Sequence, residues 1–269
     1  MPDMPAELLL PEARALQPDG LDAALAHFAA EGYARLGRVL SDEGIARLAA
    51  RADDLMHGRV VYPGMFFQRD SPTGNYDDLA FKRGYEGPSP NYRKVEKLEL
   101  DPLFLSWIEN PLYEAVARRL IDGPITLYRA CIFNKSIEGG TELPWHQDGG
   151  QFWGIDRNPT LQIWAALDDT PLEAGAIELI PRTHSAGLRT PFGGSISPEI
   201  VAARGEPSLF LPAKAGEAIL IHNHVWHRSG LNQSGHPRRA LTFCYMTAAT
   251  KCTRKKRAPR TFFPLFANH

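Results

Sequence analysis

A histidine and an aspartate two residues apart, His146 and Asp148, stand in the stretch PWHQDGGQFW. Alternate side chains of an extended strand project from the same face, so both groups could reach one metal ion. The downstream run AILIHNHVWHRSG offers a third candidate ligand among His222, His224 and His227. Two histidines and one carboxylate on one face of a metal are typical of a non-haem Fe(II) centre with open positions. A hydrogen-bonded structural histidine is the alternative that a His-x-Asp pair alone leaves open.

These candidates lie in the second half of the chain, among short runs rich in β-branched and aromatic residues: ITLYRACIFN, TLQIWAALDD, AIELIPRTH, SLFLPAKAGEAILIHNHVWH and RRALTFCYM. Clusters of glycine, proline, asparagine and aspartate separate the runs. Short strands divided by such turns are typical of an antiparallel β-sandwich or barrel. We therefore expect the candidate ligands on strands of a β core.

The first half of the chain has a helical pattern. Apolar positions recur every three or four residues over residues 19–57, with a break at 32–39 and a restart at Ser41, which predicts two helices around a short strand. Ser41 precedes two acidic residues, as is typical of a helix N-cap. Residues 101–120 also predict helix, with Pro111 either ending one helix or starting the next.

Residues 60–92 lose this periodicity and accumulate aromatic residues and turn formers. A loop of this length in a compact domain is usually a lid or a binding loop. The alternative is a surface loop packed by its own aromatic side chains. The basic run KCTRKKRAPR near the C-terminus leaves a similar choice, between a solvated segment and a contact with a phosphate-bearing substrate.

The 269 residues include 30 basic and 31 acidic side chains, for a formal net charge of −1. This balance creates no overall field that would attract nucleic acid or an anionic membrane, so we expect neither as a partner. The N-terminal residues do not resemble a signal peptide and no apolar run could span a bilayer, which predicts a cytoplasmic location. Three cysteines cannot all pair with one another, and Cys131 and Cys244 lie in apolar runs typical of buried thiols.

Four stretches together resemble the phytanoyl-CoA dioxygenase family of Fe(II)- and 2-oxoglutarate-dependent oxygenases: FAAEGYARLGRVLSDEGIARL, FNKSIEGGTELPWHQD, IWAALDDTPLEAGAIELIPRTHSAG and HRSGLNQSGHPRRAL. The most specific parts are the His-x-Asp pair and the later H-x-S-G-x-N-x-S motif followed by arginine; the likeness covers roughly residues 25–248. The resemblance implies a mainly β fold with flanking helices, in which N-terminal helices precede a double-stranded β-helix (jelly-roll, cupin-like) core. We expect one oxygenase domain over residues 1–269, with helical support and a lid at 19–120, the jelly-roll core at 125–248 and a C-terminal tail at 249–269.

By this resemblance His146, Asp148 and His227 hold Fe(II), 2-oxoglutarate chelates the metal, and one position stays open for O2. The distal carboxylate of 2-oxoglutarate needs a cationic partner, for which the arginine fork is well suited. Strand alternation lets only one of Arg238 and Arg239 point inward and does not say which. The family pattern places its arginine eleven residues after the distal histidine, which selects Arg238 and leaves Arg239 as the fallback.

Three further residues match positions that surround the co-substrate in the family: Ser229, Lys135 and Trp164. Each has a structural alternative, namely a turn residue, a surface lysine and a core tryptophan. His222 and His224 precede the distal motif and are interpreted as structural or substrate-side histidines. We expect the glycine pair of the WHQDGG stretch to leave room beside the metal.

The implied reaction oxidises a C–H bond of a small metabolite or natural-product intermediate while 2-oxoglutarate becomes succinate and CO2. Asp148 favours hydroxylation over chlorination, because halogenases of this wider group lack the carboxylate ligand; desaturation, epoxidation and ring formation stay open. We expect the substrate to contact Phe67, Arg83, Phe152 and Trp153. Two alternative functions are a non-catalytic jelly-roll protein that binds a ligand and a zinc hydrolase that uses the same three metal-binding side chains.

Overall fold

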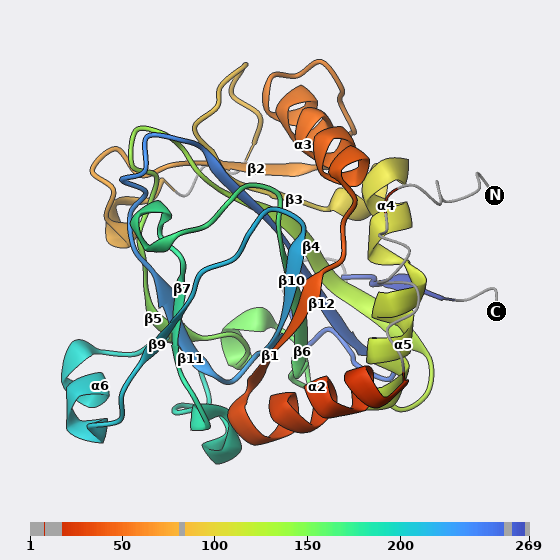
Figure 1. Cartoon of the computed structure of the whole chain (residues 1–269), viewed down its shortest axis with the longest axis vertical. Coiled ribbons are helices and arrows are strands. Elements are labelled where there is room, and N and C mark those ends of the chain that lie inside the picture. Colours follow the sequence, from red (N-terminus) through yellow and green to blue (C-terminus); the bar gives the residue numbers. More distant parts are fainter. Residues whose placement is uncertain (1–7, 9–17, 81–83, 256–259, 267–269) are drawn as a thin grey trace.

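The computed structural model describes residues 8, 18–80, 84–255 and 260–266, and within them two antiparallel β-sheets face each other (Figure 1). The large sheet has the strand order β1-β10-β6-β12-β4-β3-β2, with β13 paired to β4, and the small sheet has the order β8-β5-β11-β7-β9. The strands are β1 (Tyr33–Arg38), β2 (Phe66–Arg69), β3 (Tyr92–Glu96), β4 (Ile125–Lys135), β5 (Leu143–Gln147), β6 (Leu161–Ala166), β7 (Ile177–Ile180), β8 (Gly194–Ser195), β9 (Leu209–Leu211), β10 (Glu217–His222), β11 (Trp226–Ser229), β12 (Arg238–Thr247) and β13 (Phe263–Leu265). The helices are α2 (Pro18–Glu31), α3 (Asp42–Met56), α4 (Pro102–Ile108), α5 (Pro111–Leu120) and α6 (Pro198–Arg204). This architecture confirms the mainly β, jelly-roll fold that the sequence predicts.

The two sheets pack through an apolar cluster that both of them supply. Trp164 of β6 and Ile219 of β10 come from the large sheet, and Leu179 of β7 comes from the small sheet. Farther along this inward face, polar side chains such as Lys135 and Arg238 replace apolar ones. The space between the sheets is therefore left open there as a cavity.

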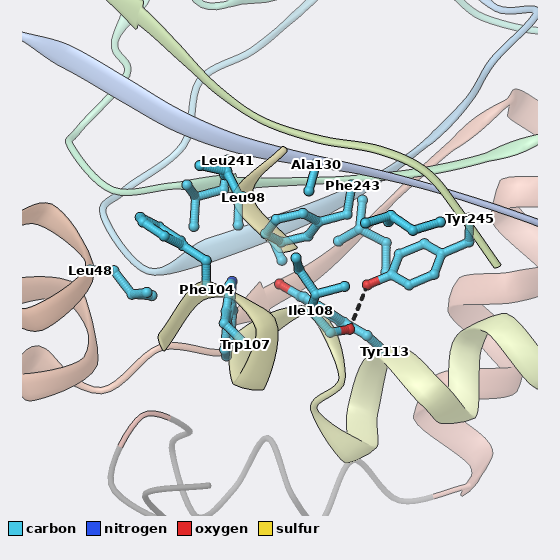
Figure 2. Close-up of a cluster of buried hydrophobic side chains, with 14 of the residues drawn as sticks. Leu48, Leu98, Phe104, Trp107, Ile108, Tyr113, Ala130, Leu241, Phe243 and Tyr245 are labelled. Atoms are coloured by element: carbon cyan, nitrogen blue, oxygen red, sulfur yellow. Dashed lines mark hydrogen bonds between the residues drawn. The ribbon is translucent and has the colours of Figure 1, made fainter. Parts of the chain in front are cut away.

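Helices α3, α4 and α5 cover the other face of the large sheet (Figure 2). Phe243 and Tyr245 of β12 lie in one buried cluster with Trp107 of α4 and Tyr113 of α5. The Tyr245 hydroxyl donates a hydrogen bond to the Ile108 carbonyl at 2.8 Å. Burial of one large apolar side chain contributes about 1.5–3 kcal/mol. This packing holds β12 in place and thereby sets the position of the residues on its inward face.

The helices begin at residues whose side chains cap them. The Ser41 hydroxyl accepts a hydrogen bond from the Gly44 N–H at 2.9 Å, which confirms the predicted N-cap of α3. The Asp101 carboxylate caps α4, and the Asn110 side chain caps α5 by accepting from a backbone N–H. Pro111 is the first residue of α5, where its missing N–H costs nothing. Pro111 therefore starts the second helix of residues 101–120.

The segment 60–92 is more regular than the sequence predicts. β2 pairs with β3 at the edge of the large sheet, so the prediction of an unstructured loop is wrong there, because four residues are too few to show a period of two. Phe67 lies opposite Val95, is buried, and packs in the core against Tyr85 and Tyr92. The expectation that Phe67 contacts substrate is therefore not supported, since its face of β2 belongs to the core.

Two further expectations concern the membrane and the thiols. In the ranges that the structure covers, no helix has both the length and the apolar character needed to cross a bilayer. Cys131 and Cys244 are buried unpaired thiols, as the sequence predicts, and Cys252 is half-buried. Burial raises the pKa of both Cys131 and Cys244 to about 12, so neither is a thiolate near neutral pH.

Candidate active site

Three potential metal ligands converge where β5 and β11 lie side by side. His146 of β5 and His227 of β11 are directly opposite each other in the antiparallel register, with ring centroids 4.0 Å apart. Asp148 follows the end of β5, and its Oδ2 lies 3.9 Å from Nε2 of His227. One ligand atom from each residue falls within 4.8 Å of the other two. The sequence prediction that these side chains lie together is therefore confirmed.

Both histidines are oriented by backbone carbonyls. Nδ1 of His146 is 2.9 Å from the Pro144 carbonyl, and Nδ1 of His227 is 2.9 Å from the Val225 carbonyl. A carbonyl only accepts, so each Nδ1 carries the proton and each Nε2 presents its lone pair to the site. Burial, together with the neighbouring His227, lowers the pKa of His146 to about 3. A neutral imidazole oriented in this way is suited to metal ligation.

The Asp148 carboxylate is held by two side chains from the large sheet. Gln162 of β6 donates its amide N–H to Oδ2, and Nη2 of Arg129 on β4 lies 3.1 Å from the same oxygen. Burial alone would raise the pKa of Asp148, but the Arg129 guanidinium and the hydrogen bond from Gln162 hold it well below its usual range. Asp148 is therefore an anion, as a metal ligand must be.

Arg129 and Gln162 are functional candidates that the sequence reasoning missed. A period of two places Arg129 on the same face of β4 as Lys135, and Gln162 on the same face of β6 as Trp164. That signal was present in the sequence. Their contact with Asp148 depends on how β4, β5 and β6 come together, which the pattern does not show.

A cavity of about 230 Å³ opens beside the three ligands. The residues of its wall that concern the site are His146, Asp148, His227, Arg93, Lys94, Arg129, Gln162, Phe133, Tyr76, Phe152, Trp153, Trp164, Ser229, Lys135, Arg238 and Thr242. Asp148 is the only carboxylate among all the described residues that line it, whereas several arginines and lysines do so. The cavity is thus suited to anionic ligands.

Arg238 and Lys135 form a pair of buried cations at one end of this cavity. They occupy opposite positions on β12 and β4 and are 3% and 5% exposed. Arg238 donates through Nη2 to the Gly175 carbonyl at 2.8 Å, and Lys135 donates to the Thr141 carbonyl. Neither forms an ion pair with a carboxylate of the described residues.

The energetic cost of this pair indicates a missing anion. Burial lowers the pKa of Arg238 to about 10, and burial together with the positive charge of Arg238 lowers the pKa of Lys135 well below its usual value. The carboxylates of Asp70 and Glu142 act on Lys135, and that of Asp168 acts on Arg238, but none of them contacts either cation, so the cost of desolvation is incompletely offset. A ligand that brought a carboxylate between them would offset that cost.

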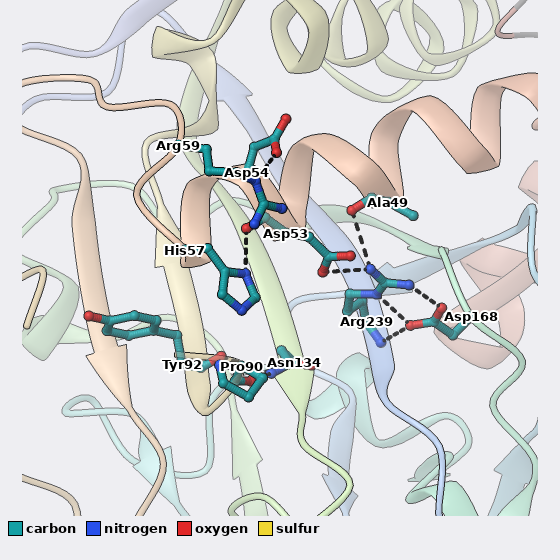
Figure 3. A network of polar contacts seen from close by, with 10 residues as sticks. All are labelled: Ala49, Asp53, Asp54, His57, Arg59, Pro90, Tyr92, Asn134, Asp168 and Arg239. Atoms are coloured by element: carbon teal, nitrogen blue, oxygen red, sulfur yellow. Dashed lines mark hydrogen bonds and ion pairs between the residues drawn. The ribbon is translucent and has the colours of Figure 1, made fainter. Parts of the chain in front are cut away.

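Arg239, the alternative to Arg238, does not line the cavity and is held instead by a network of polar contacts (Figure 3). Its guanidinium donates to both oxygens of Asp168, at 2.8 and 2.7 Å, and to Asp53 of α3 at 2.8 Å. It also donates to the Ala49 carbonyl at 3.2 Å. Arg239 therefore ties α3 to β12, and only Arg238 is available to a ligand in the cavity.

The remaining co-substrate candidates also line the cavity. Ser229 of β11 and Trp164 of β6 are both nearly buried there. Trp164 also belongs to the apolar cluster between the sheets. It is therefore both a core tryptophan and part of the cavity wall. Lys135 is buried, which makes the alternative of a surface lysine wrong.

The substrate candidates have separate outcomes. Phe152 and Trp153 line the cavity; the Phe152 side chain is 42% exposed at its mouth and Trp153 is buried. Phe67 does not reach the cavity, as described above. Arg83 lies outside the described residues.

The glycine pair after Asp148 has a different role from the one expected. Gly149 and Gly150 have φ values of +126° and +93°, which side chains rarely adopt. A Cβ on Gly150 would lie 2.2 Å from the Phe192 carbonyl oxygen, and one on Gly149 would meet Asn158 at 3.2 Å. These glycines therefore allow the loop to pack against neighbouring backbone, and the idea that they leave room beside the metal is not supported.

His222 and His224 lie outside the cluster of metal ligands. The His222 ring packs against Phe28 and His184, with ring centroids 5.8 and 4.7 Å apart. Burial and the neighbouring histidines lower the pKa of His222 to about 3. This placement agrees with the structural interpretation of these histidines.

Comparison with known proteins shows which family the chain resembles in sequence. The sequence profile of phytanoyl-CoA dioxygenase (PhyH) matches residues 28–240. The chain is 32% identical over 240 residues to phytanoyl-CoA dioxygenase domain-containing protein 1 of Rattus norvegicus, covering 78% of this chain and 82% of the relative. The protein of the same name from Bos taurus is 33% identical over 160 residues. That match covers 56% of this chain and 55% of the relative, so it spans about half of the relative's length.

A solved structure shares the fold. The epimerase SnoN of nogalamycin biosynthesis, in complex with Fe3+, alpha ketoglutarate and nogalamycin RO, superposes with a TM-score of 0.71 at 18% identity, covering 94% of this chain and 98% of that chain. Alpha ketoglutarate is the same compound as 2-oxoglutarate. With the profile matching most of its length and the His-Asp-His cluster in place, this chain belongs to the phytanoyl-CoA dioxygenase family.

Proposed function

We propose that this protein is an Fe(II)- and 2-oxoglutarate-dependent dioxygenase that hydroxylates, or otherwise oxidises, an unactivated C–H bond of a small metabolite or natural-product intermediate and releases succinate and CO2. One observation carries the proposal: a cluster of two histidines and one carboxylate shares a cavity with the buried cations Arg238 and Lys135. The cluster has the donor set of a non-haem Fe(II) site. The cations are suited to the distal carboxylate of 2-oxoglutarate.

At the metal end of the site, some residues would bind the metal and others hold a ligand in place. His146, Asp148 and His227 would occupy one face of the metal and leave the remaining positions for 2-oxoglutarate and O2. When bound, iron and 2-oxoglutarate supply the oxidising chemistry, in which O2 is consumed and a substrate C–H bond is oxidised. Gln162 and Arg129 keep the Asp148 carboxylate charged and oriented. Such supporting contacts typically strengthen metal binding about 10–100-fold.

The co-substrate end uses the inward face of the large sheet. Arg238 has further N–H groups besides the two that donate to the carbonyls of Ala174 and Gly175, and a planar fork suits a carboxylate. The Ser229 hydroxyl can add a donor, and Trp164 forms a wall that excludes water. Lys135 supplies a second positive charge opposite Arg238.

The two alternative functions explain fewer of these features. A zinc hydrolase needs three ligands and a water, but it has no use for two buried cations that no carboxylate contacts. A non-catalytic binding protein has no need to keep all three metal ligands, with the two histidines oriented by carbonyls. The dioxygenase proposal accounts for both ends of the cavity at once.

The proposal is tested by titrating the metal-stripped protein anaerobically with Fe(II) and then with 2-oxoglutarate while recording visible absorption. We expect a charge-transfer band that needs both additions. The band should be absent in His146→Ala and should require more 2-oxoglutarate in Arg238→Ala. A folded, iron-loaded parent protein without any band would overturn the co-substrate assignment and favour the zinc or binding alternatives.

A further inference from the structure

Three cationic side chains surround the ring of Phe133 in the cavity wall. The Arg93 and Arg129 guanidinium carbons each lie 6.0 Å from the ring centre, and the Lys94 ammonium lies 5.7 Å from it. All three cations and Phe133 line the cavity that holds the metal ligands. This cation group is defined here as Arg93, Lys94 and Arg129.

Arg129 of the cation group is remote from the co-substrate end, whereas Arg93 lies near enough for its charge to act on Lys135. Arg129 and Lys135 both lie on β4, six residues apart, so their Cα atoms are about 20 Å apart at the rise of a strand. Arg129 contacts Asp148, whereas Lys135 faces Arg238 at the far end of the strand. The cavity therefore has two cationic regions, and the proposed binding of 2-oxoglutarate uses only one of them.

The counter-charges around the cation group are incomplete. Lys94 is paired with Glu96 at 2.5 Å, and Arg129 is paired with Asp148, whose charge a bound metal would also share. Nε of Arg129 has no hydrogen-bond partner in the described structure. Arg93 donates to the uncharged amide oxygen of Gln68 at 2.8 Å, and no carboxylate among the described residues forms an ion pair with it.

Arg93 is 8% exposed, so its charge is largely removed from water, and the Asp70 carboxylate acts on that charge without contacting it. A desolvated guanidinium without a counter-ion in contact is costly, and an oxyanion that binds two arginines through their forks offsets that cost. The Tyr76 ring lies 5.7 Å from the Arg93 guanidinium and also lines the cavity, which gives a ligand an aromatic surface beside the charge.

We propose that the substrate carries an acidic group, a carboxylate or a phosphoryl group, that binds between Arg93 and Arg129 beside Phe133. The rest of the molecule then extends along the cavity toward His146 and His227. Calling the ligand a substrate rests on the proposed function, but the anion site itself follows from the cation group alone.

The test uses protein saturated with Zn(II), a diamagnetic substitute for iron, and with 2-oxoglutarate, so that the co-substrate end is filled. Acetate and methylphosphonate are the probes, acetamide is the uncharged control, and saturation-transfer NMR of their methyl protons reports binding. We expect both acids to bind more tightly than acetamide. The tighter of the two acids identifies the carboxylate or the phosphoryl class.

Two substitutions that each remove one positive charge show whether binding depends on a local site or on the overall charge of the protein. Arg93→Gln should weaken binding of the acids about tenfold or more, because it removes a charged donor from the site. Arg69→Gln removes one charge from the neighbouring strand β2, where Arg69 pairs with Glu86 outside the cavity lining, and should leave binding unchanged. Neither residue touches a metal ligand, so 2-oxoglutarate binding should persist in both variants.

Several results would overturn the inference: equal binding of acetamide and the acids, equal loss in both variants, displacement of the acids by excess 2-oxoglutarate, or loss of their signal when zinc is omitted. The comparison of acetate with acetamide needs no variant and so does not depend on how Arg93→Gln folds. Failure of 2-oxoglutarate to bind, with Arg93-dependent acid binding retained, would remove the proposed function but keep the anion site. The opposite pattern would remove only the anion site.

Discussion

Replacing Arg238 with alanine should weaken 2-oxoglutarate binding by about two orders of magnitude. Arg238 is 3% exposed, and two of its N–H groups donate to the carbonyls of Ala174 and Gly175, which leaves other donors for a carboxylate. A hydrogen bond to a charged group contributes about 1.5–3 kcal/mol, so loss of two such bonds costs about 3 kcal/mol or more. At about 1.4 kcal/mol per factor of ten, that is about a hundredfold in affinity. Lys135 limits the loss, because its charge remains opposite the vacated position.

The assay is isothermal titration of 2-oxoglutarate into Zn(II)-loaded protein. Arg238→Lys keeps the charge but not the fork and should lose about tenfold. Arg239→Ala is the matched control, because Arg239 does not line the cavity and its loss should leave the affinity of the folded protein unchanged. The assignment of the two arginines would be refuted if Arg238→Ala bound 2-oxoglutarate with the parent affinity. It would also be refuted if Arg239→Ala lost more affinity for 2-oxoglutarate than Arg238→Ala.

Three further predictions concern stability. Arg239→Ala should lower the free energy of unfolding by about 1.5–3 kcal/mol because it leaves the half-buried Asp168 carboxylate without its two charged hydrogen bonds, whereas Arg59→Ala, which breaks an exposed pair, should cost less than about 1 kcal/mol; urea denaturation checks both. Burial alone would raise the pKa of Glu96, but the adjacent Lys94 ammonium and other nearby cations hold it at about 2. The stability deficit of Glu96→Gln, measured by urea denaturation across pH, should therefore be full at neutral pH and shrink as pH falls from about 4.5 towards 2. Zn(II) at a hundred times its Kd should raise the free energy of unfolding by about 2.7 kcal/mol. That gain should disappear with a chelator and be absent in His227→Ala; an equal gain in the variant would place the metal elsewhere.

Local patterns predicted much of the fold. The capping residue Ser41, Pro111 at the start of a helix and the alternating strands of the second half act over a few residues, so their signals survive in the sequence. The strand Phe66–Arg69 was missed because it is short and exists only through its pairing with β3. Phe67 was misjudged for the same reason: an aromatic residue next to turn formers resembles a lid residue until its strand is known to face the core.

The sequence alone was enough to predict the family and the three metal ligands. Residue type and spacing suggested His146 and Asp148, and the resemblance to the family selected His227 from three downstream histidines. Strand alternation did not decide between Arg238 and Arg239, since a one-residue step reverses the face of a strand and the alternation has no reference for which face is inward; only the family pattern selected Arg238. The tertiary structure decided this by bringing Asp168 and Asp53 to Arg239. The charge environment of the cavity likewise arises only where separate strands meet, because electrostatic interactions depend on distance in space and not on separation along the chain.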